Sequence, residues 1–391
     1  MALNLIRNSR VFFTTNLDSS NKVKSIDFTN TNTFEIQVQD GFSFSQNTGT
    51  ETITLNEAGS APVRGQRSFN TSLEPVDWSF STYIRPKLEE GATTTLGPDA
   101  DDYVGCEESV LWNALAGKTD IGGANPGWVA TVGVSPVSTV AFGNSNVHQL
   151  FAFGLIILFD DVTYVIDNCA VDSNTIDFGL DAIASCQWAG KGTTMRSLAK
   201  TTVASANGAF SGGLTGATAK QKDTTAKYIA NKLSYMAIAS LAYGGLSAVT
   251  YTIPITGGSI SINNNLTYLT PANLGVVNEP ITYFTGTRAI SSNVTAYLKT
   301  GANESSTLLS NVLAAAATNV DNKFAVTLSL GGQGAGTRVD LSMPTAMLTI
   351  PTITSEQVIS TAITINPQAD TSGTYDVGGT NELSVKYYAA V

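Results

Sequence analysis

The chain has 391 residues, enough for two domains of ordinary size, and its hydrophobic share of 42% excludes wholesale disorder. Only 13% of the residues are charged, and the net charge is −10. This balance argues against a protein that binds nucleic-acid phosphates, because such binding needs clustered Lys and Arg. The low charge favours association with other protein surfaces.

The N-terminal segment 1–15 is apolar but contains Arg7 and Arg10. A signal peptide keeps its apolar region free of charge, so we expect no secretion signal and a chain made and folded in the cytoplasm. The longest apolar run, 151–159, is too short to span a bilayer as a helix.

Most of the chain alternates apolar and polar residues with the period of two that is typical of half-buried strands. Turn residues such as Asp40–Gly41 and Gly257–Gly258 separate these runs. The segments expected to be strands include 34–39, 51–55, 78–86, 153–159, 183–188, 259–262, 292–300, 324–330 and 358–363. Only two stretches, 108–115 and 306–313, have helical character. The pattern predicts an all-β protein with a few short helices.

The strand expected near residue 80 has two different faces, because successive side chains of a strand point to opposite sides. Tyr83 and Arg85 fall on its outer face. The inner face carries Trp78, Phe80, Thr82 and Ile84. The later segment 292–300 repeats this arrangement, with Tyr297 on its outer face.

The chain presents the same series of segments twice, in the same order. The matched pairs are 5–15 with 228–238, 78–86 with 292–300, 108–115 with 306–313, 153–159 with 324–330, and 183–188 with 358–363. An ordered series of this kind predicts a tandem duplication. We place the first copy at 1–200, a linker rich in Gly, Ala, Ser and Thr at 201–222, and the second copy at 223–391.

No arrangement of residues points to catalysis. His148 is the single histidine, and no serine lies in a GxSxG turn. The acidic run 99–102 lacks the Gly and terminal Glu of a calcium loop, and the glycine-rich stretch 331–336 lacks the Lys-Ser/Thr of a phosphate-binding loop. The three cysteines have no metal-ligand spacing and are expected to be buried thiols: Cys106, Cys169 and Cys186. We therefore expect no enzyme, no metal and no cofactor.

The segment 164–193 resembles a stretch found in bacteriophage tail tube proteins. In that family a strand leads to a run of the form I-D-F-x-L-D-x-I and closes with W-x-G-x-G. The matching residues here are Ile176, Asp177, Phe178, Leu180, Asp181 and Ile183, followed by Trp188, Gly190 and Gly192.

Other segments resemble the same family: 69–86, which holds Trp78, Phe80 and Tyr83, as well as 228–238 and 284–301. The second copy departs from the pattern, because its segment 349–363 has neither the Asp-Phe-Gly-Leu-Asp run nor the Trp.

The resemblance implies β-sandwich or half-barrel domains whose hairpins join those of neighbours into a continuous β-barrel around a channel. It implies a structural virion protein that forms stacked rings in the virion tail, assembled in the bacterial host cytoplasm, with DNA passing through the lumen during infection. Copies of the chain would be its partners, together with sheath, tape-measure and baseplate proteins.

Related tubes have six domains per ring, so a two-domain chain is expected to form a trimer with pseudo-sixfold symmetry. The alternative is a hexamer in which only the first copy lines the channel. We also expect acidic residues to outnumber basic ones on channel-facing strand positions, because a negative wall does not hold DNA.

Two other classes of function fit parts of the sequence. One is a β-sandwich adhesin or carbohydrate-binding virion protein, whose tryptophans would stack on sugars. The tryptophans in question are Trp78, Trp112, Trp128 and Trp188. The other is a capsid, baseplate or tail-tip protein that shares the tube fold.

Overall fold

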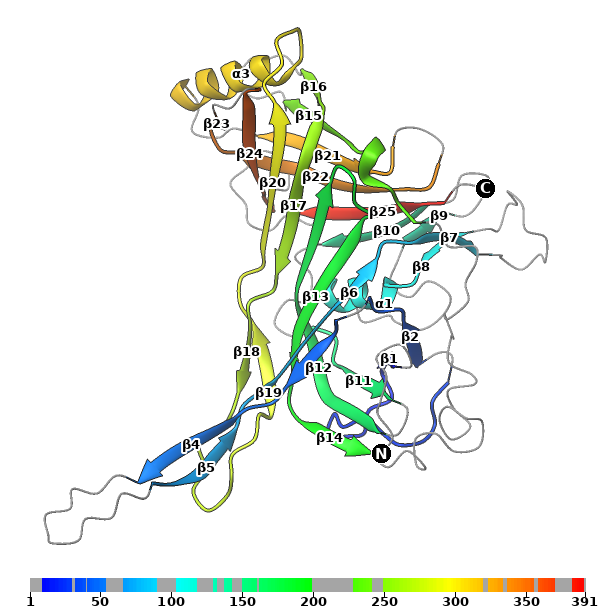
Figure 1. Cartoon of the computed structure of the whole chain (residues 1–391), viewed down its shortest axis with the longest axis vertical. Coiled ribbons are helices and arrows are strands. Elements are labelled where there is room, and N and C mark those ends of the chain that lie inside the picture. Colours follow the sequence, from blue (N-terminus) through cyan, green and yellow to red (C-terminus); the bar gives the residue numbers. More distant parts are fainter. Residues whose placement is uncertain are drawn as a thin grey trace, which may run out of the picture.

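The computed structural model describes fifteen stretches of the chain. They are residues 9–29, 32–39, 41–53, 66–89, 103–117, 129–131, 137–142, 150–159, 162–198, 228–240, 249–318, 323–332, 336–354, 358–369 and 382–389. We call residues 9–198 the N-terminal half and residues 228–389 the C-terminal half. Strands dominate both halves, so the prediction of an all-β protein is confirmed (Figure 1).

The described part of the N-terminal half contains one α-helix, α1 (Ser109–Ala116). Its strands are β1 (Arg10–Thr14), β2 (Thr33–Ile36), β3 (Ser43–Ser45), β4 (Thr48–Ile53), β5 (Arg67–Leu73), β6 (Val76–Tyr83), β7 (Pro86–Glu89), β8 (Tyr103–Cys106), β9 (Val129–Thr131), β10 (Val137–Phe142), β11 (Phe153–Leu158), β12 (Thr163–Gly179), β13 (Ser185–Gly192) and β14 (Met195–Leu198).

The described part of the C-terminal half contains α3 (Ser305–Thr318) and a short 3-10 turn at Asn231–Leu233. Its strands are β15 (Tyr235–Ser240), β16 (Thr250–Ile253), β17 (Ile255–Asn263), β18 (Leu266–Leu269), β19 (Thr282–Thr285), β20 (Ala289–Tyr297), β21 (Phe324–Leu330), β22 (Arg338–Leu348), β23 (Thr352–Thr354), β24 (Ser360–Pro367) and β25 (Leu383–Tyr388). No described helix is long and apolar enough to cross a membrane.

One continuous antiparallel array, which we call the wall, runs through both halves. Its strand order is β3–β6–β13–β12–β17–β20–β24–β23. The first four strands come from the N-terminal half and the last four from the C-terminal half. Within the wall, the junction between the halves is therefore an ordinary strand pair, β12 with β17. Behind the wall a second strand pair joins the halves, β10 with β25.

A second set of strands packs against one face of the wall. In the N-terminal half it has the order β2–β1–β11–β12–β14, and in the C-terminal half the order β16–β15–β21–β22–β25. The long strands β12 and β22 belong to both sets. In β12 the register shifts between Val171 and Ser173, and such a bulge bends a strand so that it can leave one layer for another.

The two halves thus repeat one strand arrangement. Each also carries a hairpin, β4–β5 or β18–β19, inserted between the paired wall strands β3 and β6 or β17 and β20. Each places its helix after the last of those strands. Figure 1 shows β4–β5 extending away from the body at the lower left and α3 at the opposite end of the molecule.

The core lies between the wall and the second set of strands. The side of β6 that faces the core is the side that the sequence pattern predicts to be buried. Trp78, Phe80 and Thr82 are buried there, as their alternation predicts. Trp78 stacks on Phe80 and meets Phe153 of β11 edge-on, with ring centroids 6.0 Å apart. A methyl group on Gly190, directly opposite Trp78, would collide with the indole ring. Because Gly190 has no side chain, the Trp78 ring can pack against the strand there.

One buried side chain and several element boundaries differ from the sequence expectation. Arg85 is buried, not on the outer face, because β6 ends at Tyr83 and the chain turns inward there. Its guanidinium lies 3.4 Å from the buried carboxylate of Glu107. The strand expected at 34–39 ends at Ile36, and the one expected at 183–188 begins at Ser185, with Ile183 in an isolated bridge to Ala230.

Candidate assembly surface

The wall presents a polar face away from the core. Cross-strand partners on this face run in register, for example Ser43 with Ser79, Gln187 with Thr175, and Asn293 with Thr364. Its side chains are Ser43, Ser45, Asp77, Ser79, Ser81, Tyr83, Ser185, Gln187, Ala189, Lys191, Ser173, Thr175, Asp177, Ser259, Ser261, Asn263, Ser291, Asn293, Thr295, Ala362 and Thr364. The core occupies the opposite side, so this face is open to solvent.

Charge is scarce on the polar face. Asp77, Asp177 and Lys191 are its charged members among the side chains given above. Lys191 forms a 2.7 Å ion pair with Asp77, and Asp177 accepts a 3.1 Å hydrogen bond from the Gln187 amide. Acidic residues outnumber basic ones by two to one, but hydroxyl and amide groups make up most of the surface.

The pair β12–β17 joins the halves in the plane of the wall. Its register runs from Ser173 opposite Asn263 to Gly179 opposite Gly257. Phe178 lies across from Gly258, where a methyl group would clash with the phenyl ring. Gly258 on β17 therefore leaves room for the Phe178 ring of β12.

A second contact joins the halves behind the wall, around α1. The Trp112 indole N–H donates a 2.9 Å hydrogen bond to the Tyr387 hydroxyl on β25. That hydroxyl donates a 2.5 Å hydrogen bond to the Glu108 carboxylate, which precedes α1. At the other end of α1, the Asn264 amide donates a 3.0 Å hydrogen bond to the Leu115 carbonyl oxygen. Both ends of the helix are thus held by the C-terminal half.

Glu108 is the most perturbed carboxyl in this contact. Burial raises its pKa from 4.5 to about 7, and the hydrogen bond from Tyr387 only partly opposes this effect. The second carboxyl oxygen is buried with no hydrogen-bond partner. A protonated, uncharged carboxyl suits this environment best, because an ionised one would leave a charge without full compensation.

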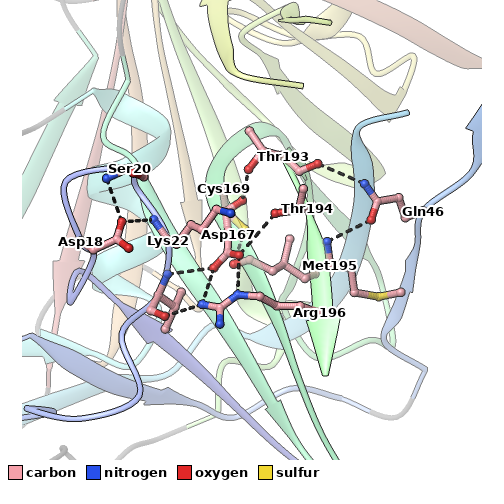
Figure 2. A network of polar contacts seen from close by, with 12 residues as sticks. Asp18, Ser20, Lys22, Gln46, Asp167, Cys169, Thr193, Thr194, Met195 and Arg196 are labelled. Carbon is pink, nitrogen blue, oxygen red and sulfur yellow. Dashed lines mark hydrogen bonds and ion pairs between the residues drawn. The ribbon is translucent and has the colours of Figure 1, made fainter. Parts of the chain in front are cut away.

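Figure 2 shows a polar cluster at the edge of the N-terminal half, centred on the fully buried side chain of Asp167. Arg196 on β14 donates to both carboxylate oxygens, at 2.7 and 3.1 Å. The backbone N–H of Val23 donates a third hydrogen bond, of 2.8 Å. One carboxylate therefore fixes the loop that follows β1 against β12 and β14.

The same cluster fixes the root of the β4–β5 hairpin (Figure 2). The Gln46 side chain accepts a 3.0 Å hydrogen bond from the Met195 N–H and donates one of 3.1 Å to the Thr193 carbonyl oxygen. Within the N-terminal loop, Asp18 accepts hydrogen bonds from the N–H groups of Ser20 and Lys22, and these lower its pKa, the bond from Lys22 most. These contacts position segments of the chain against one another.

The wall has an edge at each end. Among the described residues, β3 pairs only with β6, and β23 pairs only with β24. Met347, Ile350 and Ile353, on or between β22 and β23, have exposed side chains. An exposed apolar edge strand is a ready site for pairing with another chain.

The residues that carry the family resemblance lie in two environments. Trp78, Phe80, Ile176, Phe178 and Trp188 are buried, and Gly190 and Gly192 lie on β13 against β6 and β12. The exposed members are Tyr83, Asp177, Leu180, Asp181, Ile183 and Tyr297. Leu180, Asp181 and Ile183 form the turn between β12 and β13. Most of these residues therefore belong to the β12–β13 hairpin and the neighbouring strand β6, and they do not gather in a single site.

Three of the four tryptophans proposed as sugar platforms, Trp78, Trp112 and Trp188, are buried in the core, where no sugar can stack on them. Trp128 lies outside the described residues, as do His148, the acidic run 99–102, the linker 201–222 and the middle of the glycine-rich stretch 331–336. Cys106, Cys169 and Cys186 are free, buried thiols. The described residues contain no group of three or more His, Cys, Asp or Glu side chains placed to hold a metal ion.

The residues that join the halves were not recognised in the sequence. Tyr387 and Glu108 are 279 residues apart, and neither belongs to a motif. The only available signal was Gly257–Gly258, which we interpreted as a turn but which lies inside β17, at the junction with β12.

No protein-family profile matches the chain. The tail tube protein pb6 of Escherichia phage T5 is 32% identical to it over 374 residues. The match spans 93% of this chain and 72% of pb6.

Proposed function

The chain belongs to the phage tail tube protein family, and from this premise we propose that three copies close into a ring whose stacked repeats form the tube. The wall is the observation that supports the ring. Its two four-stranded segments lie side by side in one sheet and are joined edge to edge by β12 and β17. The same kind of junction between chains would pair β23 of one chain with β3 of the next.

A ring follows because this contact joins two different edges. Head-to-tail contacts of this kind either close or form open filaments, and closure leaves no strand edge exposed. Barrels of about 16–18 strands already enclose a water-filled channel, so three chains with eight wall strands each leave a wider one.

Three chains supply six wall segments, and the structure favours this number over six chains. In the hexamer considered above, only the first segment of each chain lines the channel. The segment β17–β20–β24–β23, however, continues the sheet of the first segment and presents its polar side chains in the same register. Both segments then face one lumen.

The lumen in this proposal is lined by the polar face of the wall. Hydroxyl and amide groups, with a small excess of acid, offer DNA neither cationic anchors nor an apolar surface. The chain then acts as a passive conduit in the virion tail, with no catalytic role. Contacts with sheath, tape-measure and baseplate proteins are proposed on the family relationship alone.

Measurement of the ring mass tests the proposal. Purified protein is examined by negative-stain microscopy, and rings are weighed by native mass spectrometry. We expect hollow tubes, and rings with the mass of three 40.9 kDa chains. Rings of six chains would overturn the trimer but keep the tube, whereas a chain that stays monomeric at all concentrations would overturn both.

A further inference from the structure

The helices α1 and α3 occupy equivalent places in the two halves but have different surroundings. Each follows, in chain order, the wall strand that comes after the inserted hairpin, β6 or β20, and each precedes the apolar strand β11 or β21. Their sequences align as 108–115 with 306–313, which places Leu115 opposite Leu313. The pair offers an internal comparison, because one chain shows the same helix in two settings.

In the N-terminal half this helix is enclosed. Every residue of α1 from Val110 to Ala116 is buried, and Leu115 is 0% exposed. The C-terminal half contributes to this enclosure through Tyr387 at one end of the helix and Asn264 at the other.

In the C-terminal half the helix is open. Leu313 is 46% exposed, and Ser310 and Ala317 on the same side of α3 are exposed as well. None of the 14 residues of α3 is charged. A helix that faces water normally carries charged residues on its outer side, and depletion of charge is typical of the centre of a protein interface.

The open helix is tied to the free edge of the wall. The Ser305 hydroxyl at the start of α3 accepts a 2.8 Å hydrogen bond from the Lys299 N–H. The preceding N–H, of Leu298, donates a 3.0 Å hydrogen bond to the Ile359 carbonyl oxygen, immediately before β24, the strand that pairs with β23. A chain that pairs with β23 therefore arrives beside α3.

We propose that the exposed side of α3, centred on Leu313, docks on the N-terminal half of the next chain in the ring. The docking segment is the counterpart of the one that encloses α1. β14 corresponds to β25, since each pairs with the long strand of its half, β12 or β22. The segment between β3 and β4 corresponds to Asn264, which lies between β17 and β18. This inference rests on the proposed ring. It adds that neighbouring chains contact each other through α3 as well as through a strand pair, and we call this contact of α3 the helical seat.

A cysteine at position 313 tests the seat directly. The native thiols are buried, so in Leu313→Cys only the introduced thiol should react with a maleimide on the folded chain. We expect fast labelling before assembly and at least tenfold slower labelling in tubes collected by sedimentation. Unfolded tubes, in which all thiols react, provide the control for complete labelling.

Two further variants test whether the contact is required. Leu313→Glu should keep the unfolding temperature of the free chain, because the side chain is exposed, but should stop assembly. Leu313→Met should assemble normally, and Ile26→Glu, at a similarly exposed apolar position, serves as the matched control.

The outcomes separate this inference from the proposed function. Tubes of Leu313→Cys in which the introduced thiol stays reactive, or tubes formed by Leu313→Glu, would overturn the helical seat and leave the tube intact. If the unmodified chain forms no rings or tubes, the proposed function fails, and the helical seat fails with it.

Discussion

The Tyr387 hydroxyl donates a 2.5 Å hydrogen bond to the buried carboxylate of Glu108, and so connects β25 to the residue that immediately precedes α1. With the 2.9 Å hydrogen bond from the Trp112 indole, it makes a polar bridge between the two halves inside an apolar core. The bridge joins residues that lie 279 positions apart in the chain, so its strength bears on the stability of both halves.

Glu108 should make stability depend on pH. Burial raises its folded pKa to about 7, from 4.5, so the folded state binds the extra proton between these values. The stabilisation is complete below pH 4.5 and is lost as the pH rises through 7, by roughly 3 kcal/mol in all. Urea unfolding at pH 5 and pH 8 measures most of this loss. Glu108→Gln, which cannot ionise, should lose less stability over the same range, and an identical pH dependence in both proteins would contradict the assignment.

Removal of the Asp167 carboxylate should destabilise the N-terminal half. Asp167→Ala leaves Arg196 and the Val23 N–H without their shared acceptor, and we expect a loss of roughly 3 kcal/mol in the free energy of unfolding. Asp77→Ala is the matched control. It breaks an ion pair of the same 2.7 Å length on the surface, where the expected cost is below about 1 kcal/mol. Equal losses in the two variants would show that burial does not determine the cost.

Gly190→Ala should disturb the packing of the wall on the core. The new methyl group meets the Trp78 ring and the Ala170 carbonyl oxygen, so the strand or the indole must move, at a cost of about 1–3 kcal/mol. Gly336→Ala adds a methyl group where nothing lies within 4 Å and should be near neutral. Thermal unfolding and the near-ultraviolet circular dichroism of the tryptophans measure the difference. An unchanged dichroism spectrum in Gly190→Ala would refute the proposed role of this glycine.

A charge on the free edge should prevent ring closure. Ile353→Lys places an ammonium group on β23, where the partner strand would pair, and lysine on an edge strand opposes such pairing. We expect a monomer with the unfolding temperature of the unmodified chain. Ile26→Lys carries the same change at 53% exposure, against 50% for Ile353, and should assemble. Sedimentation velocity separates the two results, and tubes of Ile353→Lys would rule out β23 as the joint.

The alternation of residues determined much of this fold. Trp78, Phe80 and Thr82 are buried because a strand exposes every second side chain to one side, and this period is a local property of the sequence. The helices expected at 108–115 and 306–313 were likewise found, although the second extends to Thr318. The repeated order of segments indicated two similar halves, and the halves do share one strand arrangement. Whether they are separate domains with the boundaries given above stays a prediction.

Only the tertiary structure decided which edges meet. Nothing in the sequence of β12 selects β17 as its neighbour over another exposed strand, because backbone hydrogen bonding is common to all strands and the partners are far apart in the chain. For the same reason the bridge from Glu108 to Tyr387 and the burial of Arg85 were not predictable. The contrast between enclosed Leu115 and open Leu313 also emerged only here, since two similar helices differ in exposure according to what folds against them.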